Sequence, residues 1–407
     1  MSKNLKIYAD VIEQEAIDQI ELLMAQPAFA DCKVRIMPDV HAGAGCVIGF
    51  TADLGDKVIP NVVGVDIGCG MRTTKVEGNM DFEKLDAVIR EKIPSGMTVH
   101  EPEHGCYRES DKYKLDELRC NKHLRGGDYF LRSIGTLGGG NHFIEVDVDD
   151  DGNHYLVIHS GSRNLGKQVA DYYQNLAIER EYGSRDEFAK KRNQLISELR
   201  KQGRDKEISD ALAALKLEWN NRLLDGKSRM PTQLCYLTGQ DRDDYLHDME
   251  ICQWYARINR YEMTRAIVDS MGWYVDDWFE TVHNYIDFAS NIVRKGAVSA
   301  RKGERLLIPM NMRDGSLICI GKGNDDWNQS APHGAGRLMS RRAARERLSL
   351  DDYKETMSGI FTTSVGVDTI DEAPAAYKPV SAIAPLIGDT VEIVKTIRPV
   401  YNFKAGE

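Results

Sequence analysis

The sequence predicts a mixed α/β fold (α/β to α+β), with central mixed β-sheets flanked by helices and a helical insertion. Three observations predict it: short apolar runs that end in glycine-rich loops, an alternating hairpin pattern around an acidic turn, and long stretches with apolar residues at helical spacing. Strand-like and helix-like segments in one chain favour sheets that are covered by helices.

Short strands and turns are predicted before the first helix. The runs 32–50 and 57–70 are apolar and end in glycine-rich loops, which is typical of buried strands with functional ends. A helix is predicted over 82–93, because apolar residues recur there at helical spacing after Asp81, a suitable N-cap, and the pattern stops before Pro94.

A β-hairpin is predicted next, with one strand from His142 to Val148, the acidic turn 149–153, and a second strand that runs into His159. Between 167 and 230 the sequence becomes charged and helix-forming. This change predicts an amphipathic helical insertion with a solvated face.

The rest of the chain alternates helices with strands and loops. A helix is predicted over 243–271, and strand and loop patterns return beyond 281. A basic helix is predicted over 336–349. Ser349, with Asp352 three residues later, forms a capping pair that opens the next helix.

Composition limits the classes of function. The 407-residue chain has a formal charge of −10, which argues against a general nucleic-acid coating protein but is compatible with a locally basic groove. The N-terminus lacks an apolar signal core, and no stretch approaches the roughly 18 apolar residues of a membrane span, so a cytoplasmic protein without a membrane partner is expected. The eight cysteines form no CxxC pair, so most are expected to be buried thiols.

Six side chains in glycine-rich loops form a candidate metal site. They are Asp66, Cys69, His142, His159, His283 and His333. Taken singly, each histidine is a hydrogen-bonded loop residue and Cys69 a buried thiol. Taken together, imidazole, thiolate and carboxylate are the standard protein ligands of metal ions. Ligand type alone favours zinc, and a cysteine bridge beside Asp66 is also compatible with two metals that bind phosphoryl oxygens.

His333 begins a glycine loop that leads into the most basic part of the chain, residues 294–347. One interpretation is a solvated basic helix face. The other is a phosphate or nucleic-acid groove, in which loop N–H groups and arginines bind an anion and His333 attacks phosphorus.

Nine motifs occur in the order seen in RtcB-type RNA ligases, which this sequence resembles from about residue 30 to its C-terminus. The motifs are MPDVHAGAG, GVDIGCGM, LGGGNHFIE, HSGSR, HNY, RKGA, HGAGR, DEAPAAYK and FK. The resemblance implies one RtcB-type ligase domain over 1–407, with 167–230 as a helical insertion within it.

The activity implied by the resemblance is GTP-dependent joining of RNA 3′-phosphate or 2′,3′-cyclic phosphate ends to 5′-hydroxyl ends, in RNA repair or tRNA splicing. In the implied mechanism, His333 takes GMP from GTP, the RNA 3′-phosphate accepts that GMP, and the 5′-hydroxyl displaces it. The implied partners are RNA, GTP and an archease-like activator.

The same resemblance assigns roles to individual residues. Two Mn²⁺ ions bridged by the cysteine are implied, which overrules the zinc favoured by ligand type. The implied metal ligands are Asp66, Cys69, His142, His159 and His283, and the implied nucleotide contacts are Asn141, Glu145, His283, Asn284, Pro309, Gly334, Ala335, Gly336, Tyr377 and Lys404.

The loop 308–316 departs from the family pattern. Met310 and Asn311 stand where many relatives have glycine and serine, and Arg313 is expected to supply a different phosphate contact. Two alternatives therefore stay open: a Mn-dependent RNA cyclic phosphodiesterase or end-processing enzyme, and a non-catalytic RNA-end binding protein.

Overall fold

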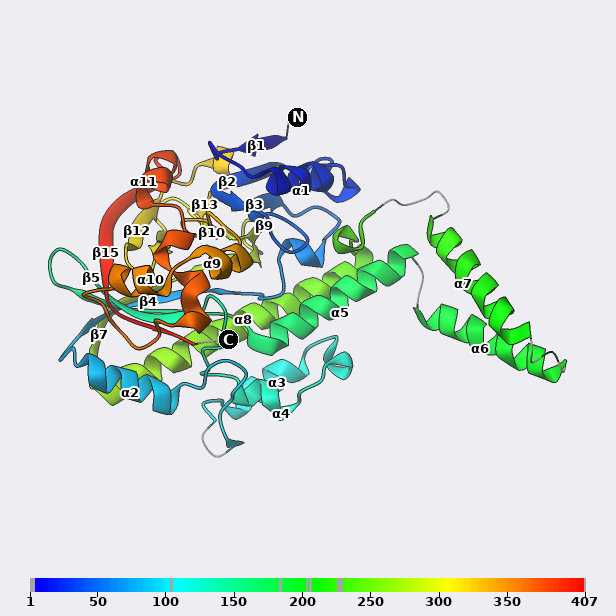
Figure 1. Cartoon of the computed structure of the whole chain (residues 1–407), viewed down its shortest axis with the longest axis horizontal. Helices are drawn as coiled ribbons and strands as arrows, with labels where there is room; N and C mark the ends of the chain where they lie inside the picture. The colour runs from blue at the N-terminus through cyan, green and yellow to red at the C-terminus, as the bar shows by residue number, and fades with distance from the viewer. Residues whose placement is uncertain are drawn as a thin grey trace.

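The computed structural model describes residues 4–102, 105–182, 185–202, 204, 207–224 and 230–405. The strands of these residues form three sheets (Figure 1). In pairing order, the largest sheet contains β11 (Arg305–Asn311), β12 (Gly315–Gly321), β15 (Val391–Lys404), β5 (Phe143–Val148), β6 (His154–Ser160), β4 (Gly70–Glu77) and β7 (Tyr274–Val282), and β14 (Phe361–Thr362) pairs with β15. The second contains β1 (Leu5–Ile7), β2 (Val34–His41), β3 (Ile48–Asp53), β9 (Ile292–Lys295) and β8 (Asn284–Asp287), and the third pairs β10 (Ala297–Ser299) with β13 (Ser330–Pro332).

A long helix, α8 (Gly239–Met271), contacts strands β6 and β4 of the largest sheet and is flanked by α2 (Phe82–Lys92) and α5 (Arg163–Tyr182). The other described α-helices are α1 (Gln14–Met24), α3 (Glu109–Asp116), α4 (Asp128–Arg132), α6 (Arg185–Lys201), α7 (Ile208–Leu224), α9 (Arg341–Arg347), α10 (Leu350–Thr356) and α11 (Val380–Ile383). Short 3₁₀-helices include η2 (Pro60–Val62), η8 (Val367–Glu372) and η9 (Pro374–Ala376).

The predicted mixed α/β class is confirmed, and several elements lie where the sequence placed them. Helix α2 begins after Asp81, whose side chain accepts a hydrogen bond from the Lys84 N–H at 2.9 Å. Strands β5 and β6 form the predicted hairpin. The Ser349 side chain caps α10 by accepting from the Asp352 N–H.

The prediction of a strand over 57–70 is wrong. Val58 makes an isolated β-bridge, the segment continues as η2 and a loop, and its last residue, Gly70, begins β4. Pro60 starts the 3₁₀ turn, and Gly64 and Gly68 have φ angles of +96° and +73°, which no regular strand accommodates. Ile67 is nonetheless fully buried, so the apolar run marks burial and not strand structure.

The predicted helix over 336–349 begins only at Arg341, with Ser340 as its N-cap. Residues before it are extended, because the Leu338 N–H donates to the Ala376 carbonyl and the Lys378 N–H donates to the Gly336 carbonyl. The glycine loop after His333 therefore does not form a helix N-terminus, which corrects that part of the anion-binding argument.

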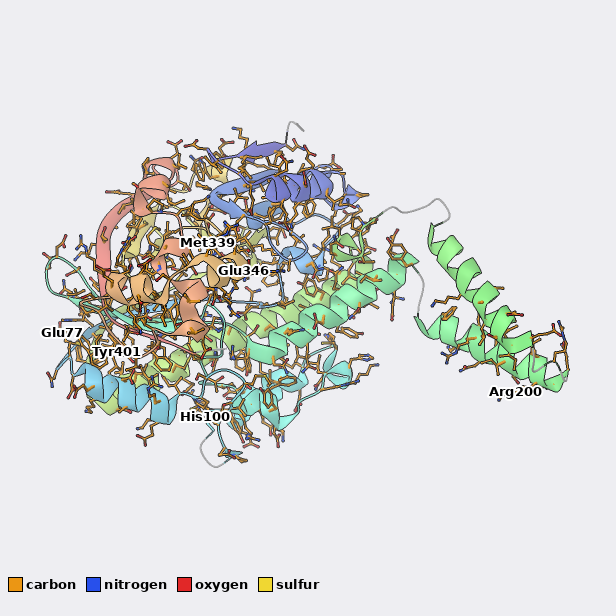
Figure 2. All side chains as sticks on the ribbon, in the orientation of Figure 1. Glu77, His100, Arg200, Met339, Glu346 and Tyr401 are labelled. Atoms are coloured by element: carbon orange, nitrogen blue, oxygen red, sulfur yellow. The ribbon has the colours of Figure 1, made fainter. Side chains whose placement is uncertain are left out.

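The charged segment that begins at residue 167 divides into a packed part and a projecting part. Helix α5 places Val169, Tyr173 and Ala177 in the main hydrophobic core. Helices α6 and α7 contact each other and extend away from the body, and Figure 2 shows Arg200 near the far end of this hairpin. Among the described residues, no helix combines the length and apolar character needed to cross a membrane.

Candidate active site

The predicted ligands converge because neighbouring strands of the largest sheet begin or end at one edge. Gly70 of β4 lies opposite Ser160 of β6 and Val282 of β7, and Phe143 of β5 lies opposite His159. The strands are antiparallel, so residues just before β4 and β5 and at the ends of β6 and β7 meet. The residues brought together in this way are Cys69, His142, His159 and His283.

The loop that carries Asp66 and Cys69 is fixed against α8. A Cβ on Gly68 would lie 3.0 Å from the Ala256 Cβ, so only glycine allows this approach. Buried Arg260 of α8 donates to the carbonyls of Gly68 at 2.8 Å and Ser160 at 2.9 Å, which joins the loop to the end of β6.

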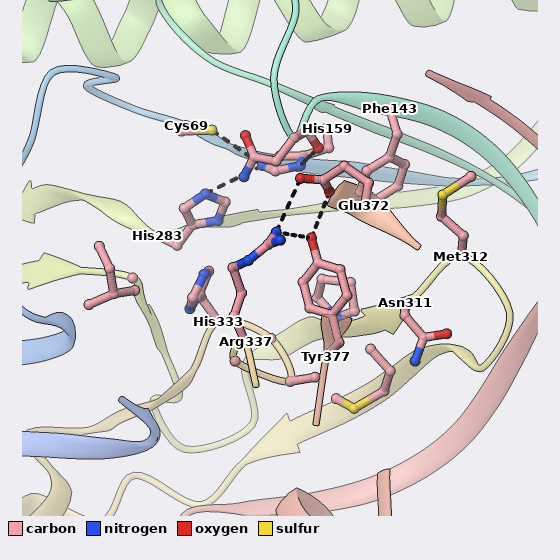
Figure 3. A pocket seen from close by; sticks show the side chains of 18 of the residues that line it. Cys69, Phe143, His159, His283, Asn311, Met312, His333, Arg337, Glu372 and Tyr377 are labelled. Atoms are coloured by element: carbon pink, nitrogen blue, oxygen red, sulfur yellow. Dashed lines mark hydrogen bonds and ion pairs between the residues drawn. The ribbon is translucent and has the colours of Figure 1, made fainter. Parts of the chain in front are cut away.

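The five predicted metal ligands form one continuous set of contacts, and Figure 3 shows Cys69, His159 and His283 among them. The Cys69 Sγ lies 3.5 Å from His142 Nε2 and 3.3 Å from His159 Nε2. His142 Nε2 is 3.0 Å from Asp66 Oδ2, and His159 Nε2 is 3.4 Å from His283 Nε2. Cys69 thus lies at the centre, with Asp66 and His142 on one side and His159 and His283 on the other.

Hydrogen bonds behind the cluster leave imidazole lone pairs facing its interior. His142 Nδ1 lies 2.9 Å from the Leu137 carbonyl and His159 Nδ1 lies 3.1 Å from the Asn141 carbonyl. A carbonyl only accepts, so each Nδ1 carries a proton and each Nε2 faces the cluster. The Nε2 of His159 is unprotonated in the neutral ring, whereas that of His142 also carries a proton when it donates to Asp66. Burial, with nearby imidazoles, lowers the pKa of His159 and His283 well below its usual value. Converging lone pairs on neutral rings fit a cation.

Cys69 and Asp66, the acidic members of the cluster, also suit the binding of a cation. Burial and the adjacent Asp66 raise the pKa of the Cys69 thiol well above its usual value, so formation of the thiolate requires nearby positive charge such as a metal ion. Burial would also raise the pKa of Asp66, but its hydrogen bond and attraction to His142 prevail and lower that pKa to about 2. The donor set therefore fits a metal ion.

His333 follows β13 and is oriented by a buried carboxylate. Asp39 Oδ2 lies 2.6 Å from His333 Nδ1 and accepts from the His333 backbone N–H at 3.1 Å. Asp39 is fully buried, whereas the His333 side chain is 22% exposed. Because Nδ1 donates to Asp39, Nε2 retains its lone pair for attack. The His333 and His283 rings lie 5.2 Å apart, so the histidine adjoins the ligand cluster.

His333 opens onto a pocket of about 310 Å³. All the predicted nucleotide contacts line it: Asn141, Glu145, His283, Asn284, Pro309, Gly334, Ala335, Gly336, Tyr377 and Lys404. Of the predicted metal ligands, Asp66, Cys69, His159 and His283 also line it. The structure therefore brings the predicted residues together, while their individual roles stay predictions.

Glu372, a buried carboxylate, lies among the cationic side chains that line another part of the pocket wall (Figure 3). Glu372 accepts from Lys404 Nζ at 2.7 Å and from the Tyr377 hydroxyl at 2.6 Å, and it pairs with Arg337 and Arg341 at 3.3 Å each. Burial opposes its ionisation, but Lys404 and Arg341 prevail and lower its pKa to about 2. Three cations around one carboxylate leave this wall positively charged, which suits a polyanionic ligand.

Most other arginines of the basic region 294–347 are already paired. The pairs are Arg294 and Arg301 with Asp287, Arg305 with Asp277, Arg345 with Asp371, and Arg342 with Glu346. Arg313 also pairs with the neighbouring Asp314 at 2.7 Å and does not line the pocket. Arg337, Arg341 and Lys404 line the pocket and share Glu372, with Arg341 also paired to Asp371, so they are the cations that face a ligand there. Arg313 lies outside this lining, and its phosphate contact stays a prediction.

Sequence reasoning gave no role to Asp39, Glu372 or Asn402, which orient His333 or line the pocket. Asp39 and Glu372 lie inside the motifs MPDVHAGAG and DEAPAAYK, and their position there was the available signal, whereas Asn402 lies outside all nine motifs. Arg341 was included among the arginines of the predicted anion groove, and it lines the pocket.

Comparison with known proteins gives one consistent result. The model of the family described as "tRNA-splicing ligase RtcB" matches residues 19–405. The chain is 28% identical to "RNA-splicing ligase RtcB" of Escherichia coli (strain K12), over 97% of this chain and 95% of the relative. It is 26% identical to "tRNA-splicing ligase RtcB" of Archaeoglobus fulgidus, over 94% of this chain and 88% of the relative.

Proposed function

This chain belongs to the tRNA-splicing ligase RtcB family and is an RNA ligase, and on that premise we propose that it joins RNA 3′-phosphate or 2′,3′-cyclic phosphate ends to 5′-hydroxyl ends with GTP. The observation that carries this proposal is the position of His333: the Asp39 carboxylate binds its Nδ1, which leaves Nε2 as the nitrogen available for attack, and the ring lies beside the ligand cluster and lines the pocket with Arg337, Arg341 and Lys404.

The proposed metal is manganese, as two ions per active site. Asp66 and His142 would hold one ion, His159 and His283 the other, and Cys69 would contact both, in keeping with its central place in the cluster. When bound, divalent cations offset the charge of the approaching phosphates. The thiolate and imidazoles also bind zinc well, so zinc is expected to compete.

The first proposed step belongs to His333. Its Nε2 attacks the α-phosphorus of GTP, a P–N bond forms, and the bond to pyrophosphate breaks. Asp39 accepts the Nδ1 hydrogen bond throughout and stabilises the positive charge that develops on the ring. Arg337 and Arg341, on the opposite wall, are positioned to neutralise phosphate oxygens.

The later proposed steps join the RNA ends. A 2′,3′-cyclic end is first opened by hydrolysis to a 3′-phosphate. An oxygen of that phosphate attacks the histidine-bound phosphorus, which frees His333 and leaves a 3′-terminal guanylate. The 5′-hydroxyl of the second RNA then attacks the RNA phosphorus, loses its proton, and expels GMP. Activation is needed because a phosphate monoester lacks a good leaving group.

We propose that the ligase is one domain over 1–407 that works in the cytoplasm, with 167–230 inserted in it. The projection of α6 and α7 from the body supports the insertion, whereas its first part, in α5, packs in the core. RNA repair and tRNA splicing are the proposed settings, with an archease-like protein as the activator.

The test is a sealing assay with GTP, Mn²⁺, and two RNAs that carry a 3′-phosphate and a 5′-hydroxyl. We expect a joined RNA and one GMP released per joint, and no product after chelation of the metal. Opening of cyclic ends without GTP and without joining would instead support the end-processing alternative. Binding without any turnover would support the RNA-end binding alternative.

The contact between Asp39 and His333 gives a sharp prediction. In Asp39→Asn, the amide keeps the volume of the side chain but removes the charge that stabilises the histidine ring. We expect single-turnover formation of the His333–GMP adduct to slow by about 10²-fold or more, with little change in the GTP concentration at half-maximal rate. A rate equal to that of the unaltered protein would contradict this positioning role.

A further inference from the structure

Two carboxyl groups lie side by side beneath the nucleotide pocket. Glu145 and Asp147 are two residues apart on β5, so their side chains share one face of the sheet. Glu145 lines the pocket, and Asp147 is fully buried behind it. The two side chains are in hydrogen-bond contact. Across the described residues, no N–H or hydroxyl group donates to either oxygen of Asp147.

The charged and titratable groups around Asp147 are engaged elsewhere. Asp147 lies opposite Pro399 of β15 and Tyr155 of β6, and the Tyr155 hydroxyl donates to Asp149 at 3.0 Å. Lys395 Nζ also binds Asp149, at 2.6 Å, and Lys404 Nζ binds Glu372. Glu145 is therefore the hydrogen-bond partner of the Asp147 carboxyl group.

Two carboxyl groups in contact inside a protein do not both ionise, so the pair holds one proton. Burial raises the pKa of Glu145, but Glu145 accepts from the Asn402 amide at 2.6 Å and lies near the charge of Lys404, and both favour its ionised form over that of Asp147. Asp147 has neither a donor nor a nearby cation. Burial and the adjacent Glu145 raise the pKa of Asp147 well above its usual value, so Asp147 keeps the proton and donates it in a hydrogen bond to Glu145.

We propose that Asp147 is a positioning residue for nucleotide selection: as a neutral acid it holds the Glu145 carboxylate in the pocket, where that carboxylate accepts hydrogen bonds from the adjacent N1–H and N2–H groups of guanine. The inference rests on the proposed function and on the predicted role of Glu145, which lines the pocket, as a nucleotide contact. Adenine presents an acceptor at N1 and a donor at N6, so it leaves one carboxylate oxygen facing a lone pair.

The test compares Asp147→Val, which keeps the volume but removes the donor, with Asp147→Asn, whose amide still donates to Glu145. At neutral pH, we expect Asp147→Val to raise the KM for GTP in adduct formation by about tenfold or more. The ratio of kcat/KM for GTP to kcat/KM for ATP should fall as well. Asp147→Asn should remain within about threefold of the unaltered protein. Asp149→Asn, in the turn directly after β5 and bound to Lys395, is the matched control and should leave the KM for GTP unchanged.

The pH profile separates positioning from a general structural effect. In the unaltered protein, Asp147 loses its proton only at alkaline pH, and the two carboxylates then repel each other, so the KM for GTP should rise there. Asp147→Asn has no such proton and should show a flatter alkaline limb. An identical limb in both proteins, or a KM for Asp147→Val equal to that of the unaltered protein, overturns the inference.

The same assays separate this inference from the proposed function. If the unaltered protein forms no guanylate adduct with GTP, the proposed function fails. If it forms the adduct and the Asp147 variants show the same KM for GTP and the same alkaline limb as the unaltered protein, only the role of Asp147 fails. Should Asp147→Val not fold, as judged by its melting transition, the alkaline limb of Asp147→Asn still decides the question.

Discussion

Replacement of His333 by alanine is expected to abolish the covalent guanylate adduct, lowering its rate of formation by at least about 10⁴-fold. The reason is that no other imidazole around the pocket combines a buried carboxylate at Nδ1 with an Nε2 free for attack among the described residues. His159 and His283 face the ligand cluster instead. Acid-labile labelling with α-³²P-GTP in the presence of Mn²⁺ measures the effect.

The control for His333→Ala uses an RNA that already carries a 3′-terminal guanylate. Because His333 acts only in the transfer of GMP, the variant should still join this RNA to a 5′-hydroxyl end, and it should bind as much manganese as the unaltered protein. Adduct formation at an unchanged rate in His333→Ala would remove His333 from the mechanism. Loss of joining with the activated RNA would show that the substitution damages the whole site.

The sequence predicted those parts of the fold that depend on local patterns. Helix α2 with its Asp81 cap, the β5–β6 hairpin and the Ser349 cap of α10 each involve residues close together in the chain. Segment 57–70 was mistaken for a strand because its burial comes from tertiary contacts. Periodicity reports whether a side chain is buried, and it leaves the backbone conformation open where proline and glycine intervene.

The candidate site was predictable as a set of residues but not as a geometry. Motif resemblance identified Cys69 and His333 without indicating what lies behind them. The contact of His333 with Asp39 spans 294 residues of sequence. The two interpretations of the basic region stayed open for the same reason, because Asp287 and Asp371, which neutralise several of its arginines, are recognisable as partners only in three dimensions.

Replacement of Cys69 by alanine is expected to remove manganese binding and adduct formation together while leaving the fold intact. Cys69 contacts both His142 and His159, so its replacement removes the side chain expected to bind on both sides of the cluster. Cys46→Ala is the matched control: Cys46 is as buried as Cys69 and belongs to the hydrophobic core, away from the pocket lining. Metal content, adduct yield and melting temperature are measured for both variants.

We expect Cys69→Ala to lose its bound metal and to form the adduct about 10³-fold more slowly. Its melting temperature should stay close to that of Cys46→Ala, and Cys46→Ala should keep both the metal and the adduct. If Cys69→Ala retained metal and adduct, Cys69 would be a core thiol like Cys46, and the two-metal arrangement would have to be abandoned.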